Sequence, residues 1–323
     1  MLSNSTIKAT LNKSNLRVFV SLIILIFLFQ FTFNLSKAAV NSQEQVISSN
    51  HHLLRPLHKE NEVIEVISNE TVNVGDTFSV KVKKIENVHG VPKIFFDADK
   101  IPVFVLSNNW YRSLIPLSAD SKPGKHILEI YYKGHAKKID LNVMATKYPL
   151  QELTLTKEVA ALKASRTEKA LVAKTLAVLS NTKLWSGKFI FPSTSPQSTT
   201  YGVKRRVNGI INPDYFHKGL DFAAPYGSSI KASEDGKVIL VGLEPKGFVV
   251  NGNCIFLDHG HGVITGYLHL SKVLVKEDEI VKKGQIIGKV GSTGIASGPH
   301  LHWGLYVLGK TVDPISWTNM IIE

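Results

Sequence analysis

Short runs in which apolar and polar residues alternate make up two long stretches of the chain. In the first, residues 62–148, turn signals such as Asn73-Val74-Gly75-Asp76 and Lys122-Pro123-Gly124-Lys125 separate the runs. Alternation with a period of two is typical of half-buried strands, and clusters of Gly, Pro, Asn and Asp mark the turns between them. We therefore predict an immunoglobulin-like β-sandwich over residues 62–148.

The second stretch covers residues 184–323 and is also built from short apolar runs, here punctuated by glycine. The runs include Gly236–Val241, Cys254–Leu257, Val263–Tyr267 and Leu301–Val307. This pattern predicts a C-terminal domain that is nearly all β, so the fold class of the chain is mostly β.

A helical period replaces the alternation in residues 149–183, where Val172, Leu176 and Leu179 fall on one face. Ser165, with Glu168 three residues later, predicts a capping box at the start of this helix. We expect a short helical linker between the two β-domains, with its apolar face packed against one of them.

The N-terminus carries the apolar run Val18–Phe33, which follows three cationic residues and precedes the small-residue site Ser36-Lys37-Ala38-Ala39. This pattern predicts a secretory signal peptide in residues 1–39. The alternative is an uncleaved membrane anchor, although the run is short of the ~20 residues that a spanning helix needs. In both cases the chain after residue 39 is expected to be exported, to the periplasm or cell envelope. The polar residues 40–61 are expected to form a flexible leader.

The chain has 323 residues, enough for two or three folded units, and a net charge of +12. The charge is spread as +4 in residues 1–40, +2 in 41–150, +3 in 151–183 and +3 in 184–323. The densest folded run, Lys204-Arg205-Arg206, has no interleaved aromatic residues, which argues against a nucleic-acid partner. A mildly cationic surface suits an anionic cell envelope.

Cys254 is the only cysteine of the chain, which excludes an intrachain disulfide framework and a thiolate zinc cluster. It lies in the apolar run Asn253–Leu257, which reads as a core strand. We therefore predict that Cys254 packs in the core and has no nucleophilic role.

Histidines with metal-ligand spacing occur in the C-terminal stretch. His217 and Asp221 are four residues apart and can face the same way on an extended chain. His300 and His302 share one face of a strand, about 6.6 Å apart, which suits one imidazole on a metal and one beside the substrate. His217, Asp221 and His302 would thus supply the three protein ligands of a catalytic zinc site, with a fourth position left for water.

Two imidazoles, those of His269 and His300, are then left for proton transfer, because neutral imidazoles titrate in the working range. Each of these histidines could instead have no role in metal binding or catalysis, since a single histidine in a β-domain is more often packed in the core or solvated. We interpret His259 and His261, which flank Gly260, as part of a tight turn between strands and not as further ligands.

These motifs resemble the lysostaphin-type zinc metalloendopeptidases, which cleave peptide cross-links of bacterial peptidoglycan. The resemblance covers about 130 residues, from Phe191-Pro192 to Val312-Asp313-Pro314, and a much looser similarity extends upstream. It implies that His217, Asp221 and His302 bind one zinc ion per chain, and that His269 and His300 are the catalytic pair. Some relatives have lost their ligands and activate cell-wall amidases, whereas every matching position is present here.

The expected function is therefore hydrolysis of peptidoglycan cross-links, in which zinc-bound water attacks the scissile carbonyl of a peptide stem. His300 is favoured as the general base because its backbone is tied to that of His302. Glycine-rich loops at Gly242–Gly252 and Gly291–Gly298 are expected to form the substrate groove. One alternative is a non-catalytic cell-wall-binding module or an amidase activator. Another is a carrier domain, because residues 281–288 resemble a lipoyl-carrier hairpin.

Overall fold

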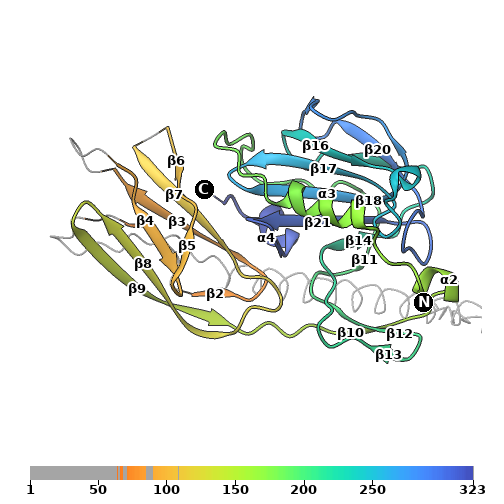
Figure 1. Ribbon diagram of the computed structural model, residues 1–323, viewed down its shortest axis with the longest axis horizontal. Helices are drawn as coiled ribbons and strands as arrows, with labels where there is room; N and C mark the ends of the chain where they lie inside the picture. Colours follow the sequence, from red (N-terminus) through yellow and green to blue (C-terminus); the bar gives the residue numbers. More distant parts are fainter. Residues whose placement is uncertain (1–63, 65, 68–70, 85–89, 108, 323) are drawn as a thin grey trace, which may run out of the picture. The chain divides into compact units, whose positions relative to one another are not determined.

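The computed structural model describes residues 64, 66–67, 71–84, 90–107 and 109–322 (Figure 1). The expected signal segment and the leader, residues 1–61, lie outside this range. The described part is mostly β, as predicted, with a few short helices. No helix among the described residues is both long enough and apolar enough to cross a membrane.

Residues 64–144 form two sheets that enclose one hydrophobic cluster, which is the arrangement of a small β-sandwich. Burial alternates along the strands as the pattern predicted, for example in Thr77–Lys83, where Phe78, Val80 and Val82 are fully buried. The immunoglobulin-like topology stays a prediction. One sheet has the order β1 (Val66–Ile67), β3 (Thr77–Lys83), β7 (Trp110–Pro116), β6 (Phe104–Val105); the other has the order β2 (Thr71–Asn73), β9 (His135–Met144), β8 (Gly124–Tyr132), β4 (Lys93–Phe96), β5 (Asp99–Ile101).

The segment expected to be a helical linker contains a strand as well as helices. Helices α2 (Lys157–Ala160) and α3 (Arg166–Leu176) are present, and the Ser165 side chain caps α3 as predicted. Strand β10 (Leu150–Leu153) precedes them and pairs in parallel with β12 (Lys204–Val207). The segment therefore contributes a paired strand to the C-terminal half, in addition to connecting it to the N-terminal sheets.

The C-terminal half is built on one large, mainly antiparallel sheet. Its strand order is β11 (Gln197–Thr199), β14 (Leu220–Phe222), β21 (Leu301–Val307), β18 (Val263–Val273), β17 (Asn253–Gly260), β16 (Gly236–Gly242), β19 (Ile280–Val281). β15 (Ser229–Lys231) pairs with β20 (Ile286–Val290), β20 also pairs with β18, and β22 (Lys310–Val312) pairs with β21. A small sheet has the order β10, β12, β13 (Ile210–Ile211), and the remaining elements are the 3₁₀ turn η1 (Glu244–Lys246) and helix α4 (Pro314–Asn319).

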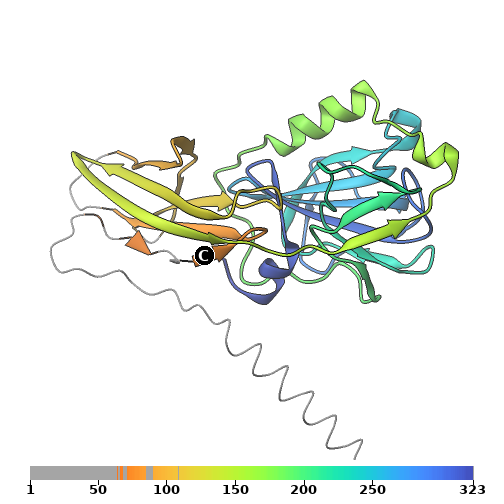
Figure 2. The same ribbon diagram turned by 90° about the horizontal axis from the view of Figure 1, so that it is seen from below.

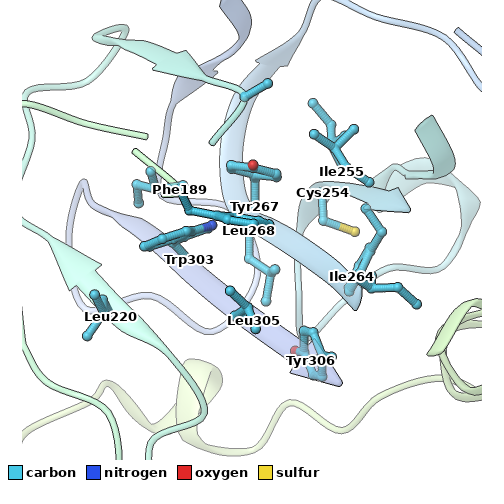
Figure 3. Packing of buried hydrophobic residues seen from close by; sticks show 14 of the residues in the cluster. Phe189, Leu220, Cys254, Ile255, Ile264, Tyr267, Leu268, Trp303, Leu305 and Tyr306 are labelled. Carbon is cyan, nitrogen blue, oxygen red and sulfur yellow. The ribbon is translucent and has the colours of Figure 1, made fainter. Parts of the chain in front are cut away.

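A dense apolar core lies against this sheet. Tyr267, Trp303 and Leu305 are fully buried, and Figure 3 shows their side chains in one cluster with the thiol of Cys254 nearby. Burial raises the pKa of Cys254 to about 12. Cys254 is therefore a core residue, as predicted. Val172 and Leu176 of α3 pack against the same core, and Figure 2 shows α3 lying along the outside of the C-terminal half.

The predicted turn at His261 and Gly262 joins β17 to β18, and both residues have positive φ, 52° and 72°. His259 is buried at the end of β17, and its Nε2 and Nδ1 contact the Thr265 hydroxyl and the Asp235 carbonyl. The guanidinium of Arg112 donates to Nδ1 of His261 at 2.6 Å. Both histidines therefore have structural contacts. The tight-turn prediction is right for His261 and wrong for His259, which lies within β17.

Candidate active site

Neighbouring antiparallel strands bring the predicted site residues together. In β14 and β21, Asp221 lies directly opposite His302, and Leu268 of β18 lies opposite His302 on the other side. His217 precedes β14, and its backbone is held by two hydrogen bonds: its N–H donates to the Val203 carbonyl, and its carbonyl accepts from Gly202 N–H, both at 2.8 Å. Side chains from three sequence segments therefore converge at one end of the sheet.

Three potential ligand atoms form a compact triangle. Nε2 of His217 lies 2.9 Å from Oδ1 of Asp221 and 3.0 Å from Nδ1 of His302, and Nδ1 of His302 lies 2.8 Å from the same Oδ1. All three side chains are buried, and among the described residues this is the group of histidine, cysteine and carboxylate side chains that could hold a metal ion.

The protonation of His217 suits a cation at the centre of this triangle. Nδ1 of His217 lies 2.8 Å from the Thr200 carbonyl, which can only accept, so Nδ1 carries the proton. Nε2 faces Oδ1 of Asp221 at 2.9 Å, and this oxygen only accepts. A positive charge between the two atoms, either a metal ion or a proton on Nε2, satisfies both. Tetrahedral N and O ligands 2.0–2.1 Å from one zinc ion lie roughly 3.3–3.4 Å apart, so a small outward shift of the three side chains would accommodate the ion.

The charge states agree with this arrangement. Burial raises the pKa of Asp221, but its short contacts with His217 and His302 outweigh burial, and the pKa lies well below its ordinary range. Burial lowers the pKa of His302 to about 4, against the opposing effect of Asp221. At neutral pH the site therefore offers a carboxylate and a neutral imidazole.

Arg205 holds the second oxygen of the carboxylate. Its Nη2 lies 2.8 Å from Oδ2 of Asp221, its Nε donates to the Gln151 side chain at 3.1 Å, and its Nη1 donates to the Tyr215 hydroxyl at 3.2 Å. With Oδ2 bound to Arg205, Oδ1 faces His217 and His302. Sequence reasoning treated Arg205 only as part of a surface cluster of cations, and no spacing rule connects it to Asp221.

His269 and His300 lie side by side next to the triangle, with ring centroids 4.8 Å apart. Nδ1 of His269 donates to the Thr293 carbonyl at 2.8 Å, and Nδ1 of His300 donates to the Gly298 carbonyl at 2.9 Å. The Nε2 atom of each ring is therefore left as the proton acceptor. Nε2 of His300 lies 3.9 Å from Oδ1 of Asp221.

His269 is placed by an irregularity in β18. The register with β17 shifts between the pairs Asn253–Leu270 and Ile255–Tyr267, so β18 has one extra residue there, and His269 has a left-handed φ of 66°. Burial, followed by the charges of His300 and His302, lowers the pKa of His269 to about 3. His269 is thus neutral and held in an uncommon backbone conformation.

A pocket of about 290 Å³ opens above these residues. One side is formed by Gln151, Leu153 and Leu155, alternate residues of β10 and its continuation, and another side by Ile295 and Ser297–Pro299. Of the two loops expected to form the substrate groove, Gly291–Gly298 contributes residues to this pocket, whereas none of Gly242–Gly252 is among the residues that line it. The substrate groove itself stays a prediction.

Residues 215–314 match the sequence model of Peptidase family M23. The chain contains an M23 peptidase domain. All five predicted site residues, His217, Asp221, His269, His300 and His302, fall inside the M23 segment, whereas Arg205 and Gln151 precede it. The resemblance seen in the motifs is therefore confirmed.

Curated relatives match over the M23 region. "Peptidoglycan DD-endopeptidase ShyA" of Vibrio cholerae is 41% identical over 109 residues, which are 34% of this chain and 24% of that protein. "DD-carboxypeptidase/endopeptidase Mpg" of Neisseria meningitidis is 40% identical over 111 residues, 34% of this chain and 25% of that protein. The matched part thus spans about a quarter of the length of these relatives.

A solved structure resembles a larger part of the chain. The crystal structure of a putative M23 peptidase from Pseudomonas aeruginosa is 27% identical with a TM-score of 0.55, and the match covers 76% of this chain and 94% of that one. This coverage exceeds the M23 segment, so the structural similarity includes residues upstream of it.

Proposed function

We propose that this protein is a zinc-dependent endopeptidase that hydrolyses the peptide cross-links of bacterial peptidoglycan. The observation that carries the proposal is the triangle of His217, Asp221 and His302, three buried ligand atoms 2.8–3.0 Å apart that could hold a metal ion, next to two imidazoles whose Nδ1 atoms are both bound to backbone carbonyls. The names of the M23 relatives, a peptidoglycan DD-endopeptidase and a DD-carboxypeptidase/endopeptidase, support this class of substrate.

His217, Asp221 and His302 would hold one zinc ion, which supplies Lewis-acid polarisation of the scissile carbonyl and lowers the pKa of a bound water to roughly 7. Arg205 keeps the Asp221 carboxylate oriented by binding Oδ2, so that Oδ1 points to the two imidazoles. Such outer hydrogen bonds fix the direction of a ligand.

His300 takes the proton of the attacking water on Nε2, because that atom lies only 3.9 Å from Oδ1 of Asp221. His269 faces the same space, and its neutral Nε2 orients the attacking water by accepting a hydrogen bond from it. The proton then passes to the departing amine. Carbonyl acceptors at Nδ1 of both rings keep the tautomer that leaves Nε2 available.

The pocket suits an extended peptide stem. It is lined by residues of β10 and of the 295–299 loop, and it offers apolar Leu153 and Leu155 beside polar Ser297 and His300. Since the substrate lies outside the cytoplasm, we place the protein in the periplasm or cell envelope, exported through its N-terminal segment. We also keep, as proposals, a β-sandwich before residue 149 and a peptidase domain from residue 184, and we add β10 and α3 to the latter because they pair with β12 and pack on its core.

The test is digestion of a defined cross-linked muropeptide by the purified protein, with and without a zinc chelator, with the fragments identified by mass spectrometry. We expect cleavage that the chelator abolishes and that added zinc restores. His300→Ala should abolish turnover while zinc content stays near one per chain, whereas loss of zinc would make His300 a ligand. A protein that lacks zinc and does not cleave would instead be a wall-binding module or an amidase activator.

A further inference from the structure

The carboxylate of Glu168 in the first turn of α3 is buried and binds a distant backbone segment. Glu168 is 2% exposed. Its Oε2 accepts hydrogen bonds from the N–H groups of Val249 and Val250, both at 3.1 Å, and its Oε1 accepts from Asn251 N–H at 2.7 Å. One carboxylate therefore satisfies three consecutive backbone donors that lie about 80 residues away in the sequence.

This is a correction to the predicted capping box. Only half of the box forms: the hydroxyl of Ser165 accepts from Glu168 N–H at 3.0 Å, while the Glu168 carboxylate is used on residues 249–251. Ser165 contacts the same loop, because its hydroxyl donates to the Gly247 carbonyl at 2.8 Å. The first turn of α3 thus hydrogen-bonds to residues 247–251 through two side chains, those of Ser165 and Glu168.

The other side of this segment touches His269. The carbonyl of Asn251 accepts from the backbone N–H of His269 at 3.1 Å, and the carbonyl of Val250 accepts from Ile295 N–H at 2.9 Å. Gly252 approaches Thr293 so closely that a Cβ would lie 2.4 Å from its Oγ1, and the carbonyl of Thr293 accepts from Nδ1 of His269. The backbone of His269 is therefore hydrogen-bonded to the segment that Glu168 holds, and its imidazole is hydrogen-bonded to Thr293, which lies against the next residue, Gly252.

The conformation of His269 makes this support necessary. Its φ of 66° lies in the left-handed region, which a residue with a side chain occupies only when the surroundings impose it. Burying a carboxylate is also costly and persists only when charge-assisted hydrogen bonds offset it. The buried carboxylate of Glu168 and the left-handed backbone of His269 are both stabilised by hydrogen bonds to residues 249–251.

We propose that Glu168 is a positioning residue for His269: by holding residues 249–251 it fixes the peptide unit that orients the catalytic imidazole. This inference rests on the proposed function, in which His269 acts in catalysis. Helix α3, which precedes the M23 segment, is thus a working part of the catalytic unit. Glu168 does not line the pocket and so acts through His269.

The test compares Glu168→Gln with Glu158→Gln, an exposed carboxylate on the neighbouring helix α2. Glutamine has the shape of glutamate, but its NH₂ group must face at least one backbone N–H. We expect kcat on the cross-linked muropeptide to fall on the order of ten- to a hundredfold, as for a misplacement of up to about 1 Å, with KM and zinc content unchanged. Glu158→Gln should match wild type.

Glu168→Asp keeps the charge and should recover part of the lost kcat. If Glu168→Gln does not fold, Glu168→Asp is decisive, and a kcat equal to that of wild type would overturn the inference. For folded Glu168→Gln, a kcat equal to that of Glu158→Gln would do the same. So would a parallel loss of zinc, since this would indicate general damage to the site.

The NMR signals of the His269 imidazole separate this inference from the proposed function. We expect them to shift in Glu168→Gln and not in Glu158→Gln, whether or not the protein cleaves muropeptides. Absence of cleavage by wild-type protein would refute the proposed function alone. Unchanged His269 signals in Glu168→Gln would refute the positioning role alone.

Discussion

The Tyr267 hydroxyl anchors β18 two residues before His269, and its removal should lower stability without changing the chemistry. Tyr267 is fully buried, and its oxygen accepts from Ser233 N–H at 2.9 Å, lies 2.6 Å from the Ser233 hydroxyl and accepts from the Thr265 hydroxyl at 3.1 Å. Tyr267→Phe keeps the ring and its packing. The change therefore isolates the contribution of these hydrogen bonds.

The magnitude follows from which groups lose their partners. Thr265 keeps its contact with Nε2 of His259 at 2.8 Å, whereas the N–H and hydroxyl of the fully buried Ser233 both lose Tyr267. A buried polar group without a partner costs about 1–3 kcal/mol, so two such groups give a loss of about 2–6 kcal/mol in the free energy of unfolding. For a unit of this size, that corresponds to a fall in Tm of about 4–24 °C.

Guanidinium titration followed by circular dichroism, with calorimetry for Tm, measures the change. Tyr226→Phe is the control, because Tyr226 is 69% exposed. We expect zinc content and kcat of Tyr267→Phe, both measured well below Tm, to equal those of wild type. A loss of stability no larger than that of Tyr226→Phe would refute the argument, and a selective fall in kcat would mean that the hydroxyl also acts in the site.

Three further predictions concern the pocket, the ligands and pH. Leu153→Ser should raise KM for the muropeptide about fivefold, as expected for loss of about 1 kcal/mol of apolar contact, whereas Leu150→Ser on the same strand but outside the pocket should not; equal KM values for the two variants would contradict the assignment. His302→Ala should lose bound zinc in metal analysis, whereas His269→Ala should keep it; retention by both would remove His302 from the ligand set. Burial raises the pKa of Asp313 to about 6, so the folded state binds more protons than the unfolded state between pH 4 and 6, and the free energy of unfolding falls as pH rises through this window, by on the order of 2–3 kcal/mol. Asp313→Asn keeps an acceptor for Ile315 N–H and should flatten this slope in urea titrations at pH 4.5 and 7; an unchanged slope would exclude Asp313 as its source.

The mostly-β fold and the members of the candidate site could be predicted because their signals are local. Alternation of apolar residues determines which face of a strand is buried, as in Thr77–Lys83. The spacing of His300 with His302 follows from the two-residue period of strands, whereas His217 lies in the segment before β14 and meets Asp221 through the path of that segment. These patterns require no knowledge of which strands pair.

The supporting contacts could not be predicted because they depend on that pairing. Arg205 reaches Asp221, and Glu168 reaches residues 249–251, only after distant segments meet. The loop at residues 242–252 was expected to line the pocket because glycine-rich loops often do, but its carbonyl and N–H groups are used to hold His269 and to bind Glu168. The left-handed φ of His269 has no signature in sequence, since histidine seldom adopts it.

The parallel pairing of β10 with β12 determines how far the protein can be shortened. Parallel neighbours need a long crossover, and here the connection contains α2 and α3. A fragment cut to the borders of the family match, residues 215–314, would lack β10 and β12 together with the pocket wall that β10 supplies. It would also lack β11, which pairs with β14, and would leave that edge of β14 uncovered. The smallest version worth purifying for crystallography or inhibitor screening therefore begins before Leu150.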